Sequence, residues 1–388
     1  MNEYEMICRF EELKLESRFL PYAYGSKKKT LTYSGQSERA NFIFFSDSHI
    51  DFSNPNESFD NVKQVFDYAN RSTVKFDALI HTGDIITPFG IKDKHSSYEN
   101  ARRFFDLAKA CRSPLIFSKG NHDLNDWDNL PENVFTDDDW GSMYLDFAEE
   151  SFGIKRQEKK CGSKSTWHYY DVESKKIRII SIDALDSDKK TVNENGTVKF
   201  HGGRSFYVSN EQINWFASTA LNFDDKSDKN WGVIVAFHHD GGSTKPPHEN
   251  AVSKLMKICA AFNTQSTYEN EYKNDEFPFF DMSVSADFSR YGELDEKPHM
   301  ICILMGHDHV DRERVRDGIN VIYTLNNSAS TDYSDDRVVR IPGTATQNSF
   351  DILNIDTTHR EIRVFRYGAG VNCYGVGGDR FLPDGLKY

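Results

Sequence analysis

Short runs of apolar residues alternate with amphipathic stretches along most of the chain. The runs at 41–46 (NFIFFS), 78–81 (ALIH) and 115–118 (LIFS) have the composition of strands that are buried on both faces. Between them, apolar residues recur every three or four positions in 57–70 and 98–108, which predicts an amphipathic helix after each of the first two strands. Strands joined by helical crossovers pair in parallel, so the pattern predicts an α/β protein whose sheet is covered on both sides.

The second half of the chain repeats these signals. Five further segments have strand-like patterns: 177–182, 231–237, 300–304, 319–323 and 361–367. Ser209 and Gln212 have the spacing of a capping box, in which each side chain satisfies a backbone N–H of the other residue. This spacing predicts a helix that begins directly after Ser209.

We expect one main domain between two polar ends. Residues 1–40 are polar and poorly periodic and are interpreted as an N-terminal arm, and residues 371–388 are interpreted as a glycine-rich tail. Within the domain at 41–370, the polar, turn-rich segments near 186–208 and 241–298 look like insertions. Long ordered connections often shape binding sites, so we expect these two segments to influence specificity.

Composition and charge narrow the functional classes. The chain has 388 residues, with 47 Lys and Arg against 60 Asp and Glu, which gives a net charge of −13. This acidic balance disfavours a nucleic-acid partner, which needs clustered basic residues. No apolar run is long enough to span a membrane, and the six cysteines are scattered in a chain without a visible signal peptide. We therefore expect a cytoplasmic protein with no membrane partner.

Short polar motifs follow the predicted strands. They are Asp47-Ser48-His49, Gly83-Asp84, Gly120-Asn121-His122-Asp123, His238-His239 and Gly306-His307-Asp308-His309. Ligands of α/β sheets bind at the carboxyl ends of strands, so these residues should share one edge. The motifs offer imidazole, carboxylate and amide-oxygen ligands and no thiolate, a combination that suits divalent ions of the first transition row. A carboxylate can also bridge two such ions. The motifs therefore indicate a two-metal site that can clamp an in-line displacement and lower the pKa of a bound water molecule.

In this order and spacing, the motifs resemble the signature of the calcineurin-like metallophosphoesterase superfamily, over about residues 41–309. The resemblance implies an α/β fold of the calcineurin-like type, a four-layer α/β/β/α sandwich with two mixed sheets and a dinuclear site on strand-end loops. It also implies a metal-dependent phosphoester hydrolase, in which a hydroxide that bridges two metals attacks phosphorus. The expected cofactors are two divalent or trivalent ions drawn from Mn, Fe, Zn and Ni.

The resemblance also implies a role for each motif residue. The implied metal ligands are Asp47, His49 and His309 for one ion, Asn121, His307 and either His238 or His239 for the other, and Asp84 as the bridge. His122 would face the substrate and protonate the leaving oxygen, and Asp123 would orient the imidazole of His122. Adjacent side chains of an extended strand end point in opposite directions, and the family register favours His238 over His239.

Departures from the family pattern exclude some branches of the superfamily. Thr87 stands where purple acid phosphatases have a tyrosine, so no iron–tyrosinate site is expected. Residues 85–88 also lack the Asp-Arg-Gly of phosphoprotein phosphatases. These departures favour a phosphodiesterase that acts on a small or nucleotide-like phosphoester. The alternatives are a phosphomonoesterase, a nuclease, and an inactive member that serves as a binding module.

Two features near the motifs have open interpretations. Trp127 follows the Gly-Asn-His-Asp motif and would be available to line the pocket and stack on a base. Residues 201–204 (His-Gly-Gly-Arg) would either bring Arg204 to a phosphate or form an exposed turn of the insertion. The turn is the preferred interpretation.

Overall fold

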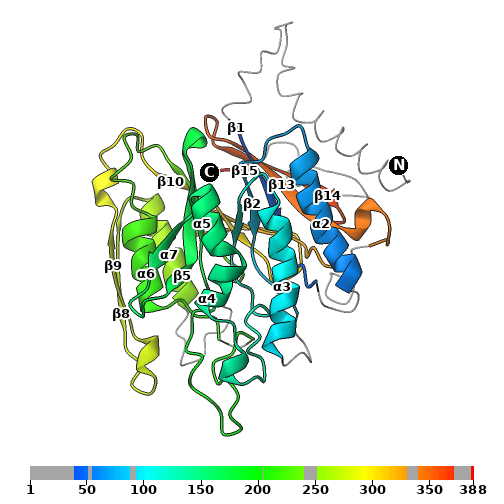
Figure 1. The fold of residues 1–388 in the computed structure, drawn as a ribbon. Helices are drawn as coiled ribbons and strands as arrows, with labels where there is room; N and C mark the ends of the chain where they lie inside the picture. Colours follow the sequence, from blue (N-terminus) through cyan, green and yellow to red (C-terminus); the bar gives the residue numbers. More distant parts are fainter. Residues whose placement is uncertain are drawn as a thin grey trace, which may run out of the picture.

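The fold is built on two mixed β-sheets that pack face to face, with helices on their outer faces (Figure 1). The structure is a computed structural model that describes residues 39–50, 55–87, 93–203, 205–239, 251–329, 340–370 and 386–388. Most of the expected N-terminal arm, and residues 371–385 of the expected tail, lie outside these residues. The four-layer α/β sandwich implied by the family resemblance is confirmed.

The first sheet has six strands. Their order is β15 (Leu386–Lys387), β14 (Glu361–Gly368), β13 (Ser349–Asp356), β1 (Arg39–Phe45), β2 (Ala78–His81) and β3 (Leu115–Phe117). β1, β2 and β3 are parallel, as the crossover pattern predicts, and β13 is antiparallel to β1. The two crossover helices are α2 (Pro55–Arg71) and α3 (Lys94–Lys109).

The second sheet has seven strands. Their order is β11 (Arg312–Arg316), β12 (Ile319–Tyr323), β10 (His299–Met305), β7 (Gly232–Ala236), β6 (Ile177–Ser181), β5 (Lys164–Val172) and β4 (Lys155–Glu158). The four strands from β12 to β6 are parallel, and β11, β5 and β4 run antiparallel to their neighbours. The sequence pattern misses β4, β5 and β11, because these strands are largely polar or short.

The remaining elements cover the sheets. They are α4 (Asp137–Trp140), a π-helical turn (Gly141–Leu145), α5 (Asp146–Phe152), α6 (Asn210–Trp215), a second π-helical turn (Phe216–Ala220), α7 (Ala251–Asn263), and the hairpin β8 (Thr267–Tyr272) and β9 (Met282–Asp287). Short 3-10 turns lie at Pro131–Asn133, Glu173–Lys175, Pro278–Phe280, Ser289–Tyr291 and Ala345–Gln347. In Figure 1, α6, α7 and the hairpin lie on one side of the sandwich, and α2 and α3 lie on the other. Among the described residues, no helix is both long enough and apolar enough to cross a membrane.

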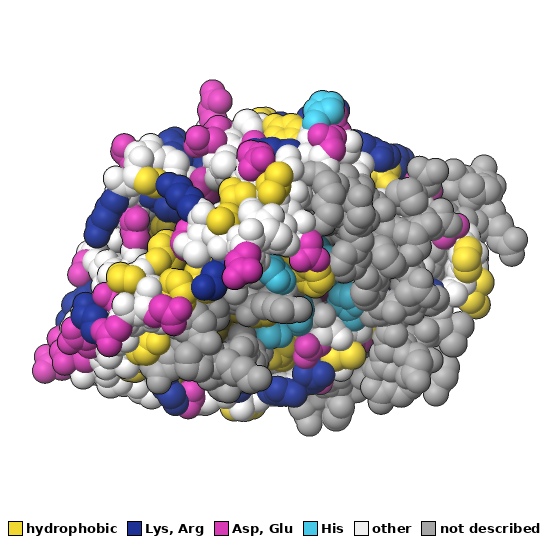
Figure 2. All heavy atoms as spheres, turned by 90° about the horizontal axis from the view of Figure 1, so that it is seen from below, with side chains coloured by type: hydrophobic (Ala, Val, Ile, Leu, Met, Phe, Trp, Pro, Cys, Tyr) yellow, Lys and Arg dark blue, Asp and Glu magenta, His cyan; other side chains and the backbone are white. Residues whose placement is uncertain are grey.

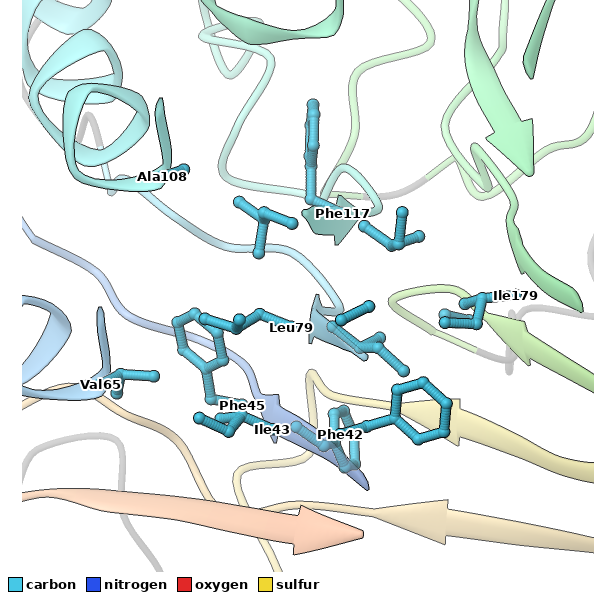
Figure 3. Packing of buried hydrophobic residues seen from close by; sticks show 14 of the residues in the cluster. Phe42, Ile43, Phe45, Val65, Leu79, Ala108, Phe117 and Ile179 are labelled. Atoms are coloured by element: carbon cyan, nitrogen blue, oxygen red, sulfur yellow. The ribbon is translucent and has the colours of Figure 1, made fainter. Parts of the chain in front are cut away.

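Alternation along the strands produces two hydrophobic cores. On β1, Phe45 packs against the helices, with ring centroids 6.0 Å from Phe66 of α2 and 6.3 Å from Phe104 of α3. Phe42 lies on the opposite face of the same strand, toward Ile179 of the second sheet (Figure 3). Because successive side chains of a strand point to opposite faces, one strand contributes to both layers of packing. This packing fixes the strand ends that carry the polar motifs.

The helix predicted after Ser209 is present, but its capping differs from the prediction. The Ser209 side chain accepts a hydrogen bond from the Gln212 N–H at 3.2 Å, as expected for a cap. The Gln212 side chain does not complete a capping box, because its amide accepts from the Asp183 N–H at 2.8 Å and donates to the Asp183 carbonyl at 2.9 Å. Gln212 therefore joins α6 to the segment after β6.

Candidate metal centre

The predicted site residues lie together where five strands end. Asp47 and His49 follow β1, Asp84 follows β2, residues 121–123 follow β3, His238 follows β7, and His307 and His309 follow β10. Backbone hydrogen bonds join these ends: the Asp47 N–H donates to the Gly83 carbonyl at 2.9 Å, and the Gly306 N–H donates to the His238 carbonyl at 3.1 Å. The site is therefore built from both sheets, and histidine side chains gather near the middle of the face in Figure 2.

The backbone of these motifs is not extended. Five predicted ligands have positive φ: Asp47 (54°), His49 (43°), Asp84 (56°), His307 (67°) and His309 (53°). Residues 47–49 and 307–309 therefore do not continue β1 and β10 as extended backbone. The left-handed conformation is uncommon outside glycine, although Asp and His adopt it more readily than most residues. Such strain is typical of functional sites, where surrounding structure enforces it.

Two motif glycines allow the strand-end loops to approach closely. A Cβ on Gly120 would lie 2.1 Å from Asp84 Oδ1, and a Cβ on Gly306 would lie 2.5 Å from Asp47 Oδ2. Any larger residue would push a carboxylate out of place. Glycine at these positions is therefore required for the two aspartates to reach the cluster.

One group of donor atoms surrounds Asp47. Asp47 Oδ1 lies 3.1 Å from His309 Nε2, and the Nε2 atoms of His49 and His309 are 3.4 Å apart. With Asp84, these residues bring four donor atoms within 4.8 Å of one another, and all four residues are buried. This set matches the ligands expected for the first ion.

A second group shares Asp84. Its Oδ2 atom lies 3.2 Å from His238 Nε2, which in turn lies 3.2 Å from His307 Nδ1. Asn121 Oδ1 lies 3.0 Å from His238 Nε2 and 2.8 Å from His307 Nδ1. Because Asp84 belongs to both groups, the donor set fits two ions that share one carboxylate.

The structure separates the adjacent residues His238 and His239. The His238 ring is buried in the second donor group, whereas the His239 ring stacks on Phe206, with centroids 4.3 Å apart and an interplanar angle of 25°. The His239 ring also lies 3.9 Å from the His307 ring, on the outer side of the cluster. This placement favours His238 as the ligand, in line with the family register.

Partners outside the cluster orient the imidazoles. His49 Nδ1 is hydrogen-bonded to the Thr87 hydroxyl, and His238 Nδ1 donates to the Thr82 carbonyl at 2.7 Å. In both rings Nε2 is left facing the donor group, which is the usual way in which a metal-binding histidine is fixed. This role of Thr87 is not predicted from the sequence, where the residue marks only the absence of a tyrosine.

The protonation states of the clustered histidine and aspartate side chains bear on whether they can bind cations. Burial lowers the pKa of His49 to about 3 and that of His307 to about 2, so both rings are neutral and carry a lone pair. Burial alone would lower the pKa of His238, but the carboxylate of Asp84 outweighs it and raises that pKa to about 9. Burial alone would raise the pKa of Asp47, but His309 outweighs it and the net pKa is lowered. Asp47 is therefore ionised and the neutral rings of His49 and His307 are ready donors for divalent ions, whereas His238 is protonated and would release its proton when it binds one.

His122 lies at the edge of this cluster. Its backbone N–H donates to Asp84 Oδ1 at 2.8 Å, and its ring packs edge-on against His49 with centroids 5.2 Å apart. The side chain is 11% exposed, and burial lowers its pKa. His122 is thus placed beside the donor groups and open to a ligand, as expected for a residue that faces the substrate.

Asp123, which we expect to orient the His122 imidazole, also joins two loops of the site. Its carboxylate accepts hydrogen bonds from four backbone N–H groups. These belong to Asp84 (2.9 Å), Gly120 (2.7 Å), Ile85 (2.7 Å) and Ile86 (3.2 Å). Asp123 therefore fastens the loop after β3 to the loop after β2.

Trp127 also differs from its predicted use. Its indole stacks on the His122 ring, with centroids 5.0 Å apart and an interplanar angle of 28°. The face that was expected to be available for a base is therefore occupied by His122. His201 lies near the same indole, and Arg204 is outside the described residues.

The chain is similar to known proteins in sequence pattern and in fold. The sequence model of the calcineurin-like phosphoesterase family matches residues 40–311. A dimetal phosphatase from Danio rerio is 13% identical with a TM-score of 0.51, and the alignment covers 88% of this chain and 98% of that one. A phosphopantetheinyl hydrolase from Mycobacterium tuberculosis is 12% identical with a TM-score of 0.35, covering 75% and 91% of the two chains. No curated protein matches the chain.

Proposed function

This chain belongs to the calcineurin-like phosphoesterase family and is a metal-dependent phosphoester hydrolase, and we propose that it cleaves small phosphodiesters. The observation that carries the proposal is the pair of buried donor groups that share Asp84, with His122 at their edge. Two ions held in this way supply positive charge that stabilises the transition state and activates a water molecule. Asp47, His49 and His309 would hold one ion, Asn121, His238 and His307 the other, and Asp84 both.

The chain's own residues account for the remaining steps. His122 stands where it can donate a hydrogen bond and then a proton to the oxygen that leaves phosphorus, because its ring lies beside Asp84 and is partly exposed. Asp123 keeps the loop of His122 fixed to the loop of Asp84 through four backbone hydrogen bonds. The proton donor and the shared carboxylate are therefore held in one rigid unit.

Charge near the site favours a diester over a monoester. A monoester carries two negative charges and benefits from extra cations, whereas a diester carries one. The two lysines that flank the 120–129 loop are paired with carboxylates: Lys119 with Asp183 at 2.5 Å, and Lys189 with Asp126 at 2.8 Å. Their charge is thus largely neutralised within the protein, which supports a singly charged substrate.

The size and chemistry of the substrate are part of the same proposal. Phe206 and His239 form an aromatic pair next to His307, which supports a substrate with a planar group such as a nucleotide. The net charge of −13 supports a small phosphoester rather than a nucleic-acid polymer. We place this activity in the cytoplasm, in keeping with the sequence-based expectation.

The test is hydrolysis of bis-p-nitrophenyl phosphate and of p-nitrophenyl phosphate by metal-stripped protein refilled with Mn²⁺. We expect turnover of the diester that is lost when the metal is removed and returns when Mn²⁺ is added. Turnover of the monoester alone would replace the proposal with the phosphomonoesterase alternative. Two bound metals without turnover of either ester would favour the binding-module alternative.

A further inference from the structure

We propose that Trp127 is a positioning residue for His122, and that residues 201–203 of the insertion hold Trp127 against it. The inference rests on the proposed function, because His122 matters there as the proton donor. In this proposal residues 186–203 help to place the proton donor, in addition to any contact that they make with the substrate.

The His122 imidazole is bracketed by two rings. Trp127 stacks on one face at 5.0 Å and 28°, and His49 meets the imidazole edge-on at 5.2 Å and 87°. Aromatic pairs in these geometries are worth about 0.5–1.5 kcal/mol beyond their buried area. His49 is a proposed metal ligand with a fixed orientation, so Trp127 restricts the imidazole from its face while His49 restricts it from its edge.

The backbone around Trp127 is shaped to present its indole. Asn125 and Asp128, on either side, have φ of 55° and 46°, so the chain turns sharply before and after residues 126–127. Asp126 is fully buried, and its Oδ2 atom accepts hydrogen bonds from the Gly202 N–H and the Lys189 ammonium, each at 2.8 Å. Asp126 thus ties this loop to the insertion directly beside the indole.

The backbone of the insertion lies close against the Trp127 indole. A Cβ on Gly203 would lie 2.2 Å from Trp127 Cζ2, and a Cβ on Gly202 would lie 2.8 Å from the Asn121 carbonyl oxygen. The His201 ring lies 5.8 Å from the indole. Only glycine permits these approaches, so Gly203 is required for the indole to lie flat on His122, and Gly202 is required for the insertion to lie against the Asn121 backbone.

The expected consequence concerns proton donation. A misplacement of a catalytic group by about 1 Å can reduce a rate by about 10²-fold. Loss of Trp127 should therefore slow the cleavage of substrates whose leaving oxygen needs a proton. It should matter far less for p-nitrophenolate, which leaves without one, and it should leave metal content unchanged.

The kinetic test compares Trp127→Leu and Trp127→Phe with wild type on diphenyl phosphate and bis-p-nitrophenyl phosphate. We expect kcat on diphenyl phosphate to fall about 10²-fold in Trp127→Leu and to be largely restored in Trp127→Phe, with a much smaller loss on the activated diester. Gly203→Ala should resemble Trp127→Leu, whereas Gly292→Ala, on the far side of the second sheet at φ −62°, should behave as wild type. Equal losses on both esters, or no rescue by phenylalanine, would overturn the inference.

A second readout does not depend on activity. In protein labelled with [¹³Cε1]histidine, the His122 signal, assigned with His122→Gln, should be shifted upfield by the indole ring current. The shift should disappear in Trp127→Leu and Gly203→Ala and persist in Gly292→Ala. An unchanged His122 signal in Trp127→Leu would overturn the inference, whereas wild-type protein that cleaves no ester would overturn only the proposed function.

Discussion

Asp84 accepts a hydrogen bond from the backbone N–H of His122 at 2.8 Å, so the carboxylate shared by both donor groups also fixes the loop that carries the proposed proton donor. Its Oδ2 atom faces the histidines, and its Oδ1 atom faces this loop. One side chain thus links metal binding to the placement of His122.

Asp84→Asn should weaken both metal sites together. The amide keeps the size of the side chain but removes the negative charge that both ions would share. The check is Mn²⁺ stoichiometry and affinity by calorimetry, with Asp171→Asn, a carboxylate paired with Arg178 at 2.6 Å, as a matched control. Two ions bound with unchanged affinity would rule out a shared role for Asp84.

Thr87→Val should lower the affinity of one ion only. The change keeps the shape but removes the hydroxyl bonded to His49 Nδ1, so the ring loses the partner that orients it. Loss of such a partner commonly costs 10–100-fold in affinity, so we expect about that decrease for the ion held by His49. Calorimetric titration resolves the two events, and equal weakening of both would contradict this view of Thr87.

His122→Ala should keep both metals and lower kcat on diphenyl phosphate, whose leaving oxygen needs a proton, by about 10²–10⁴-fold, the usual contribution of a general acid. The structure predicts this separation because His122 lies at the edge of the donor groups rather than among their close contacts. Mass spectrometry measures the metal content of the variant, and steady-state kinetics measure its kcat. Replacement of the exposed His359 provides the control, and loss of an ion in His122→Ala would indicate a ligand instead.

Stability should fall on acidification, in part through His168. Burial lowers the pKa of this histidine from 6.5 to about 4, and its Nδ1–H donates to the Thr166 carbonyl at 2.8 Å. Between these values the unfolded chain binds a proton that the folded chain does not, so the free energy of unfolding decreases as the pH falls from about 6.5 to 4. The full decrease is about 3 kcal/mol.

Urea unfolding at several pH values checks this, with His168→Gln as the comparison. Glutamine retains a hydrogen-bond donor and does not titrate, so the variant should lose less stability between pH 7 and pH 4.5 than wild type. Identical pH slopes would show that His168 is not responsible.

Much of the fold follows from the sequence because buried parallel strands are unbroken apolar runs. The runs at 78–81 and 319–323 coincide with β2 and β12, and those at 115–118 and 300–304 match β3 and β10 within a residue. α7 is not predicted, since it lies in a segment whose average composition is polar. The hairpin β8–β9 is missed for the same reason, because its exposed face is polar.

The residues that form the site can be predicted from the sequence, but their backbone conformation cannot. Motif order identifies Asp47, Asp84 and His307, because the chemistry of the ligands restricts residue type. The left-handed conformation of these residues arises from contacts between loops that are distant in sequence, which local pattern does not contain. The carboxylate of Asp123 is a similar case, since its partners are backbone groups of the β2 loop, which carry no side-chain signal.

The donor groups draw on both sheets, with Asp47, Asp84 and Asn121 from the first and His238, His307 and His309 from the second. Ions held there would act as cross-links across the sandwich, and separation of the sheets would require their release. By mass action, ligand at about 100 times its Kd adds about 2.7 kcal/mol to stability. Melting temperature should therefore rise with metal concentration in wild type and rise less in Asp84→Asn, so that metal supply would set the stability of the folded chain as well as its chemistry.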